Sequence, residues 1–226
     1  MCPTAEIETS TMGVLFDLDG VLVDSSACLF VAWCEWAAGH GIDGEAAYAV
    51  GSGRTTIEQI RAVAPQLATE TEVQRLDALE DRYVTEVTAQ PGARRAVEGL
   101  AGARWGIVTS CPLDNAMARL AQAGLPVPDT FICAGDVVNG KPAPDAYLLG
   151  AQRLGLSPRD VLVFEDAPLG IAAAKAAGMQ VTALATTHPV DELGDADFSI
   201  ADLAGATFST AGGDRITVSL AAATPP

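Results

Sequence analysis

The stretch from Val14 to Asp24 constrains this chain more than any other. It begins with the apolar run Val14-Leu-Phe16, which is typical of a strand buried on both faces. Asp17 and Asp19 follow two residues apart, and an extended backbone directs such residues to the same face. Carboxylates this close raise each other's pKa unless a cation neutralises them. The stretch therefore predicts a bound divalent metal or an acid kept protonated as a proton donor, and a phosphoryl-transfer site uses both.

The same residues have two simpler interpretations. Asp-Gly is common in turns, so Asp19-Gly20 also fits a strand that ends in an acidic turn. Asp-x-Asp-Gly also opens calcium-binding loops, but the register of such a loop from Asp17 puts Cys28 where a glutamate is needed. On this stretch alone, the turn and the active site both remain open.

Composition and charge exclude several classes of protein. The chain has 226 residues, enough for one large or two small domains, and 49% of them are hydrophobic, enough to bury a core. The net charge of −16, from 29 acidic and 13 basic residues, argues against a nucleic-acid or anionic-membrane surface. No apolar run is long enough to span a membrane. We expect no nucleic-acid partner and no membrane partner.

The cysteines and the first residues give two further expectations. The five cysteines are an odd number without a Cys-x-x-Cys pair, and no secretory signal precedes them. Free thiols in a reducing cytoplasm are the simplest account, so we expect a cytoplasmic protein. Residues 1–12 are polar, and we expect them to be loosely ordered.

The chain divides into a helical stretch and an alternating stretch. No convincing strand occurs between about 25 and 90, and apolar spacing and capping residues predict helices there over 25–39, 55–63 and 69–88. After Pro91-Gly92 the pattern alternates. Strands are predicted over 105–109, 131–134, 161–164 and 181–184, and helices over 93–100, 113–123, 143–154 and 169–177.

This alternation indicates an α/β fold with a parallel, Rossmann-like sheet. We therefore expect a core domain of residues 1–24 and 91–226, with residues 25–90 inserted as a helical domain after the first strand. The last stretch is less regular, and 215–220 is predicted as an edge strand.

Polar residues follow several of the predicted strands. Asp17 and Asp19 end the first, Thr109-Ser110 follows the second, and Glu165-Asp166 follows a later one. Each pair alone fits a helix cap, and Lys141 alone fits a solvated turn. Because ligands bind at the carboxyl ends of parallel strands, these residues are expected to converge. Together they offer acids for a hard cation, hydroxyls and amides for a phosphate, and a lysine that offsets negative charge.

Four ordered motifs resemble those of the haloacid dehalogenase superfamily. They are Asp17-Leu-Asp-Gly-Val-Leu-Val-Asp-Ser25, Val108-Thr-Ser110, Gly140-Lys-Pro-Ala-Pro-Asp-Ala-Tyr147 and the stretch from Val163 to Gly178. The helical insertion resembles the cap of the sugar-phosphate phosphatases and β-phosphoglucomutases in that superfamily. Asp17 with Asp19 two positions further implies phosphoryl chemistry rather than dehalogenation.

The resemblance implies a role for each motif residue. Asp17 is expected to be the nucleophile that forms an aspartyl-phosphate, and Asp19 the general acid and base. Thr109 and the amide of Ser110 are expected to bind the phosphoryl oxygens, and Lys141 to pair with Asp17 and the phosphoryl group.

The resemblance also implies a Mg²⁺ site. Its expected ligands are Asp17, Asp166 and the backbone carbonyl of Asp19, with Glu165 close to the metal. The cation and Lys141 would screen the repulsion between a carboxylate and a phosphate dianion.

Two features of the sequence bear on the choice between a phosphatase and a phosphomutase. The β-phosphoglucomutases carry a histidine on the first cap helix at the position of Leu29, and neither His40 nor His188 replaces it. The absence favours a phosphatase, and the segment Ala185-Thr-Thr-His-Pro189 resembles the hexose- and polyol-phosphate phosphatases.

In the cap, Arg54 is a candidate substrate ligand, although a plain surface arginine is an equal interpretation.

The sequence therefore predicts a Mg²⁺-dependent phosphatase of small sugar or polyol phosphates; it does not determine the oligomeric state, for which a monomer is favoured. The alternative is a β-phosphoglucomutase-like phosphomutase. A response-regulator receiver also uses an aspartate, Mg²⁺ and a lysine, but it lacks a helical insertion of this size. A catalytically silent binding protein of the same fold conflicts with the complete residue set.

Overall fold

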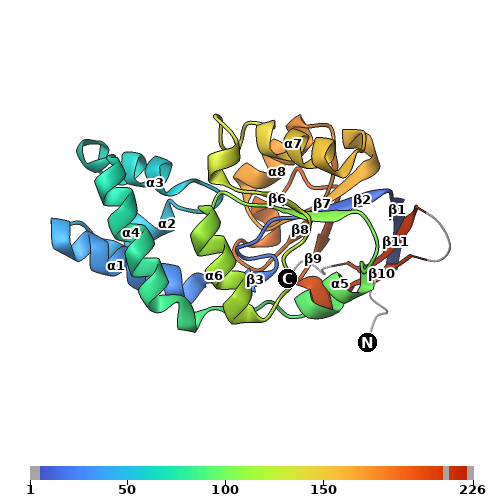
Figure 1. The fold of residues 1–226 in the computed structure, drawn as a ribbon, viewed down its shortest axis with the longest axis horizontal. Coiled ribbons are helices and arrows are strands. Elements are labelled where there is room, and N and C mark those ends of the chain that lie inside the picture. The colour runs from blue at the N-terminus through green and yellow to red at the C-terminus, as the bar shows by residue number, and fades with distance from the viewer. Residues whose placement is uncertain (1–5, 211–213, 223–226) are drawn as a thin grey trace.

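The protein is described by a computed structural model that covers residues 6–210 and 214–222. Figure 1 shows an α/β part built around a sheet and a group of helices, α1 to α4, that extends from one end of it. Among the residues covered, no helix combines the length and the apolar character needed to cross a membrane.

The centre of the α/β part is a six-stranded sheet in which every neighbouring pair is parallel. The strand order is β6-β5-β2-β7-β8-β9, so the first motif lies on an inner strand. This arrangement confirms the predicted Rossmann-like fold. The strands are β2 (Gly13–Phe16), β5 (Trp105–Val108), β6 (Thr130–Ile132), β7 (Val161–Glu165), β8 (Gln180–Leu184) and β9 (Phe198–Ile200).

Helices cover both faces of this sheet. Side chains alternate along β2, so Phe16 packs on one face and Leu15 on the other, and both are fully buried. The face of Phe16 is covered by α5 (Ala93–Gly99) and α6 (Leu113–Ala123). The face of Leu15 is covered by α7 (Asp145–Leu154) and α8 (Pro168–Ala176).

A second, antiparallel sheet joins the two ends of the described chain. Its order is β1-β11-β10, with β1 at Glu6–Thr11, β11 at Ile216–Ala221 and β10 at Ala206–Ser209. The expectation of a loosely ordered start is therefore wrong for Glu6–Thr11, because these residues pair with β11 along their whole length. The strand predicted near the end is present, but it is central rather than an edge. Residues 1–5 lie outside the described part.

Residues 26–83 form what we call the helical segment. Its helices pack around their own core, which includes Trp33, Trp36, Ile60 and Leu76. The helices are α1 (Ser26–His40), α2 (Gly44–Ala49), α3 (Thr56–Val63) and α4 (Glu70–Tyr83). The short helix α2 was not predicted.

Two short strands connect the helical segment to the sheet. They are β3 (Val23–Asp24) and β4 (Thr88–Ala89), which form an antiparallel pair. The helix predicted over 69–88 ends earlier, at Tyr83, because a single 3₁₀ turn at Val84–Glu86 leads the chain into β4. The two crossings between the parts of the molecule therefore lie side by side.

Candidate active site

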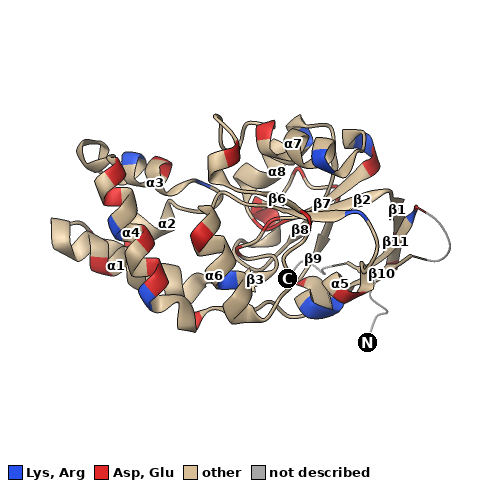
Figure 2. Cartoon of the chain, in the orientation of Figure 1, with Lys and Arg blue, Asp and Glu red and all other residues tan. Residues whose placement is uncertain are grey.

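The polar residues predicted to converge lie around one pocket. A cavity of about 300 Å³ opens between the carboxyl ends of β2, β5 and β7 and the helical segment. Figure 2 shows acidic residues gathered close to β7 and β8 in the middle of the view. The predicted residues that line the cavity are Asp17, Asp19, Thr109, Ser110, Asp166 and Arg54.

Lys141 lies at the centre of the buried charges. Its Nζ donates hydrogen bonds to Asp17 Oδ1 at 2.5 Å and to Glu165 Oε1 at 2.6 Å. Lys141 is 3% exposed and Asp17 is 7% exposed, so these contacts are shielded from water. The loop before α7 thus places its ammonium group directly against the carboxylate at the end of β2.

Burial perturbs the pKa values of these groups. Burial raises the pKa of Asp17 to about 7, against the opposing attraction of Lys141, and the nearby Glu165 adds to the rise. Burial likewise raises the pKa of Asp166 well above its usual range, with Glu165 and Asp17 contributing. Burial alone would lower the pKa of Lys141, but the carboxylates of Asp17 and Glu165 raise it well above its usual value. The cluster is therefore crowded with negative charge that one lysine does not fully offset.

Glu165 is held from several sides. Its Oε1 also accepts a hydrogen bond from Tyr147 Oη at 3.0 Å, and its Oε2 accepts from the amides of Asp166 and Ala167 at 2.9 and 3.0 Å. A Cβ at Gly170 would overlap this carboxylate, so α8 passes close to it only because glycine occupies that position. Glu165 thus fixes the position of Lys141.

Three of these acids are close enough to hold a metal ion. One carboxylate oxygen from each of Asp17, Glu165 and Asp166 lies within 4.8 Å of the others. Carboxylate oxygens are the ligands that hard cations such as Mg²⁺ prefer, and a cation would offset the burial and the repulsion from Glu165 that raise the pKa of Asp17. The residues present therefore fit a divalent metal. The glycine after Asp19 allows the Asp166 carboxylate to lie close to the backbone, because a Cβ at Gly20 would overlap that carboxylate.

The loop after β5 offers polar groups to the same pocket. Thr109 is buried, and its Oγ1 accepts a hydrogen bond from the Cys111 amide at 3.0 Å, which leaves its own proton for a ligand. The Ser110 hydroxyl instead donates to the carbonyl of Gly53 in the helical segment at 2.9 Å. Ser110 therefore connects the two parts of the molecule across the pocket.

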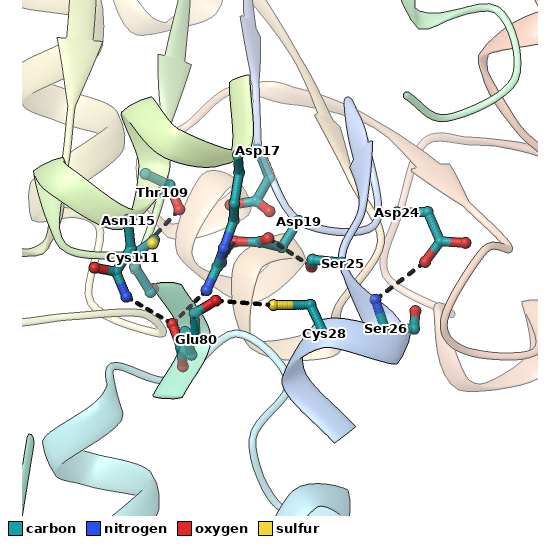
Figure 3. Close-up of polar contacts among 12 residues, drawn as sticks. Asp17, Asp19, Asp24, Ser25, Ser26, Cys28, Glu80, Thr109, Cys111 and Asn115 are labelled. Carbon is teal, nitrogen blue, oxygen red and sulfur yellow. Dashed lines mark hydrogen bonds and ion pairs between the residues drawn. The ribbon is translucent and has the colours of Figure 1, made fainter. Parts of the chain in front are cut away.

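Asp19 has a different environment from Asp17. Its Oδ1 accepts a hydrogen bond from Ser25 Oγ at 2.6 Å, and its Oδ2 accepts from Arg119 Nη1 at 2.7 Å. Figure 3 shows Asp19 beside Ser25, with Asp17 behind it at the end of the strand. The side chain of Asp19 is thus oriented by partners that do not touch Asp17.

Other residues singled out from the sequence also lie at the pocket. Arg54 is exposed on its wall and donates to the Val50 carbonyl of its own loop at 2.5 Å. Leu29 and His188 line the wall as well. Cys111 also lines the pocket and is buried, and burial raises the pKa of its thiol well above its usual range.

Several residues at the site were missed from the sequence. Arg119 and Glu80 line the pocket and pair with each other, and Tyr147 contacts Glu165. One signal was available for Arg119, because it falls on the apolar face of its helix beside Ala116 and Leu120. A charged side chain among apolar positions is unusual unless it has a partner.

Comparison with known proteins assigns the family. Residues 11–178 match the family described as haloacid dehalogenase-like hydrolase. Hexitol phosphatase A of Escherichia coli is 41% identical over 196 residues, which cover 84% of this chain and 91% of that protein. Glycerol-1-phosphate phosphohydrolase 2 of Saccharomyces cerevisiae is 34% identical over 202 residues, covering 84% and 81%.

A solved structure agrees with this assignment. The crystal structure of a hydrolase from Pseudomonas syringae superposes with a TM-score of 0.75 at 25% identity, covering 84% of this chain and 94% of that one. Together with the match over residues 11–178, this shows that the chain belongs to the haloacid dehalogenase-like hydrolases.

Proposed function

We propose that this protein is a Mg²⁺-dependent phosphatase that hydrolyses small sugar or polyol phosphates through an aspartyl-phosphate. The observation that carries the proposal is the buried contact of Lys141 with Asp17 and Glu165, beside Asp166. The names of the two relatives, a hexitol phosphatase and a glycerol-1-phosphate phosphohydrolase, support the substrate class.

The first step is attack by Asp17. An oxygen of its carboxylate forms a bond to phosphorus, and the bond between phosphorus and the alcohol oxygen breaks. Asp19 donates a proton to the departing alkoxide. Thr109 and the amide of Ser110 hold the phosphoryl oxygens, and Lys141 reduces the repulsion between Asp17 and the incoming dianion.

The second step releases phosphate. Asp19, now ionised, takes a proton from a water molecule, whose oxygen attacks the phosphorus of the aspartyl-phosphate. The bond to Asp17 breaks, and inorganic phosphate leaves. Asp17, Asp166 and the backbone carbonyl of Asp19 would hold Mg²⁺, with Glu165 nearby. The ion would neutralise charge on the phosphoryl oxygens.

We also propose that residues 25–90 act as a cap over a core domain of residues 1–24 and 91–226. The pocket lies between these parts, and Ser110 joins them through the carbonyl of Gly53. Closing such a cap excludes water from the site. Arg54 lies on the cap side of the pocket and is the proposed contact for substrate hydroxyls.

Leu29 favours hydrolysis over transfer between sugars. It lines the pocket where the related mutases carry a histidine, and an aliphatic side chain cannot exchange protons with a sugar hydroxyl. A mutase would convert glucose 1-phosphate to its 6-phosphate when a bisphosphate is added.

The deciding experiment measures phosphate release from glycerol, hexitol, hexose and nucleotide monophosphates with and without Mg²⁺. Asp17→Asn is the test variant, and Asp24→Asn is the matched control, because Asp24 lies in the same motif but is exposed and caps Ser26. We expect metal-dependent release from polyol or hexose phosphates that Asp17→Asn abolishes and Asp24→Asn retains. Normal turnover by Asp17→Asn would refute the proposal.

A further inference from the structure

Arg119 is a buried arginine held between two carboxylates from different parts of the molecule. It projects from α6 and is 4% exposed. Its Nη1 donates to Asp19 Oδ2 at 2.7 Å, and its Nη2 donates to Glu80 Oε2 at 2.5 Å. Asp19 follows β2, whereas Glu80 belongs to α4 of the helical segment. The two ends of one guanidinium therefore connect the sheet edge to the helical segment.

The partners of Arg119 are themselves held in place. Ser25 binds the second oxygen of Asp19, so both carboxylate oxygens have a fixed donor. Glu80 is 5% exposed and accepts a hydrogen bond from Asn115 Nδ2 at 2.8 Å, and its backbone carbonyl accepts from the Cys28 thiol at 3.4 Å. Figure 3 shows Glu80 between Asn115 and Cys28, with Asp19 nearby. The network thus includes α1, α4, α6 and the loop after β2.

Stability alone is a poor account of this arrangement. Buried ion pairs contribute little net stability, because desolvation offsets most of their attraction, and apolar side chains of similar size commonly replace them without loss. Apart from Asn115, the other buried residues on the helix of Arg119 are apolar, so an apolar side chain would pack beside Leu120. Yet Arg119, Asp19 and Glu80 all line the pocket. The network is better explained by what it does to Asp19.

We infer that Arg119 is a positioning residue that holds Asp19 in the orientation required for proton transfer, and that Glu80 ties this orientation to the helical segment. The inference rests on the proposed function, in which Asp19 protonates the departing alkoxide and later accepts a proton from water. Proton transfer depends on placing donor and acceptor within hydrogen-bond reach. A planar guanidinium bound to two carboxylates restricts the orientation of both, and so keeps the Asp19 carboxylate in one position.

The test compares three variants. Arg119→Met removes the guanidinium but keeps an unbranched apolar chain in place of the arginine stem. It also leaves the Glu80 carboxylate buried without its cation, which endangers folding. The double variant Arg119→Met, Glu80→Gln removes that problem, because the glutamine still bonds Asn115 and carries no charge. Arg153→Met is the matched control, since Arg153 also pairs with a carboxylate, that of Asp136, but lies outside the pocket.

Two kinds of substrate separate proton transfer from the rest of the reaction. An alkyl phosphate such as glycerol 1-phosphate needs a protonated leaving group, whereas p-nitrophenolate leaves without a proton. We expect kcat for the alkyl phosphate to fall about 100-fold in both Arg119 variants, with KM changed less than about threefold. With p-nitrophenyl phosphate, we expect one rapid equivalent of nitrophenol per active site and then slow turnover, because only the second step still needs Asp19.

The outcomes are distinct. If the double variant regains both thermal stability and wild-type kcat on the alkyl phosphate, Arg119 only joins the two parts and the inference is refuted. If the first turnover of p-nitrophenyl phosphate falls as much as alkyl turnover, Arg119 does not act through proton transfer. If the wild-type protein hydrolyses p-nitrophenyl phosphate but no alkyl phosphate, it is the proposed function that fails. Low alkyl turnover in a stable double variant, with the rapid phase retained and Arg153→Met unaffected, supports the inference.

Discussion

Replacing Asp77 by asparagine tests the electrostatics of the helical segment. Asp77 is half-buried on α4, and its Oδ1 is buried without a hydrogen-bond partner among the described residues. Burial raises its pKa from 3.8 to about 6, and the carboxylates of Glu80 and Asp81 add to the rise. An aspartate whose pKa is raised by folding destabilises the folded state wherever it is ionised. We therefore expect Asp77→Asn to stabilise the protein at neutral pH.

The size of this effect follows from the pKa difference. A difference of about 2 corresponds to about 3 kcal/mol, but Asp77 is only half-buried, so screening by solvent reduces the expected gain to roughly 1 kcal/mol. The destabilisation is absent below the unfolded pKa of 3.8, grows as the pH rises, and is complete above the folded pKa of about 6. The gain from Asp77→Asn should therefore be about half as large at pH 5 as at pH 8.

Urea unfolding followed by tryptophan fluorescence measures this gain, because Trp33 and Trp36 lie in the core of the same segment. Asp129→Asn is the control for removing one negative charge, since Asp129 is exposed and lies outside the helical segment. We expect it to change the unfolding free energy by less than about 0.5 kcal/mol. A stability gain for Asp77→Asn that is equal at pH 5 and pH 8, or a loss at pH 8, would refute the electrostatic explanation.

Three other predictions follow from the structure. Gly170→Ala should lower both kcat and the melting temperature, because the added Cβ would displace Glu165. Gly39→Ala is the control: it has open space around it in α1 and should raise stability by about 0.5–1 kcal/mol, and thermal melts with steady-state kinetics compare the two variants. Mg²⁺ at 100 times its Kd should stabilise the folded wild type by about 2.7 kcal/mol and so raise its melting temperature, and Asp166→Asn should remove most of this rise in a melting titration. Ile7→Asp should cost about 1–3 kcal/mol in urea unfolding, because Ile7 pairs with Leu220 and packs against the core; unchanged stability would mean that β1 adds little to the fold.

Local sequence patterns were sufficient to predict the parallel sheet and the polar residues at the carboxyl ends of its strands. The run Val14-Leu-Phe16 is apolar at every position, which is typical of a strand covered on both faces, and the structure buries all three residues. The rule that ligands bind at the carboxyl ends of parallel strands then predicts that Asp17, Thr109 and Asp166 lie together. Each of these residues follows its strand directly, so the predicted geometry depended on few assumptions.

Pairing between distant segments was not predictable in the same way. The strand Glu6–Thr11 is rich in polar residues, so its sequence looks like a loose terminus. Its order comes from β11, more than 200 residues away, which supplies the hydrogen-bond partners. The contacts of Arg119 are similar, because Asp19 and Glu80 are 100 and 39 residues distant in the chain. A single sequence does not show which buried charges will meet.

The charges around the pocket explain how so acidic a protein would accept an anionic substrate. The charged groups discussed above that line the pocket or lie buried beside it are the acids Asp17, Asp19, Glu80, Glu165 and Asp166 and the cations Lys141, Arg119 and the exposed Arg54. Lys141 and Arg119 are each already shared between two carboxylates, so they offset only part of the negative charge that an incoming phosphate dianion adds. The acids must therefore attract a further cation before the dianion can approach Asp17. On this reasoning, the excess of carboxylates at the site is what makes the proposed reaction depend on Mg²⁺.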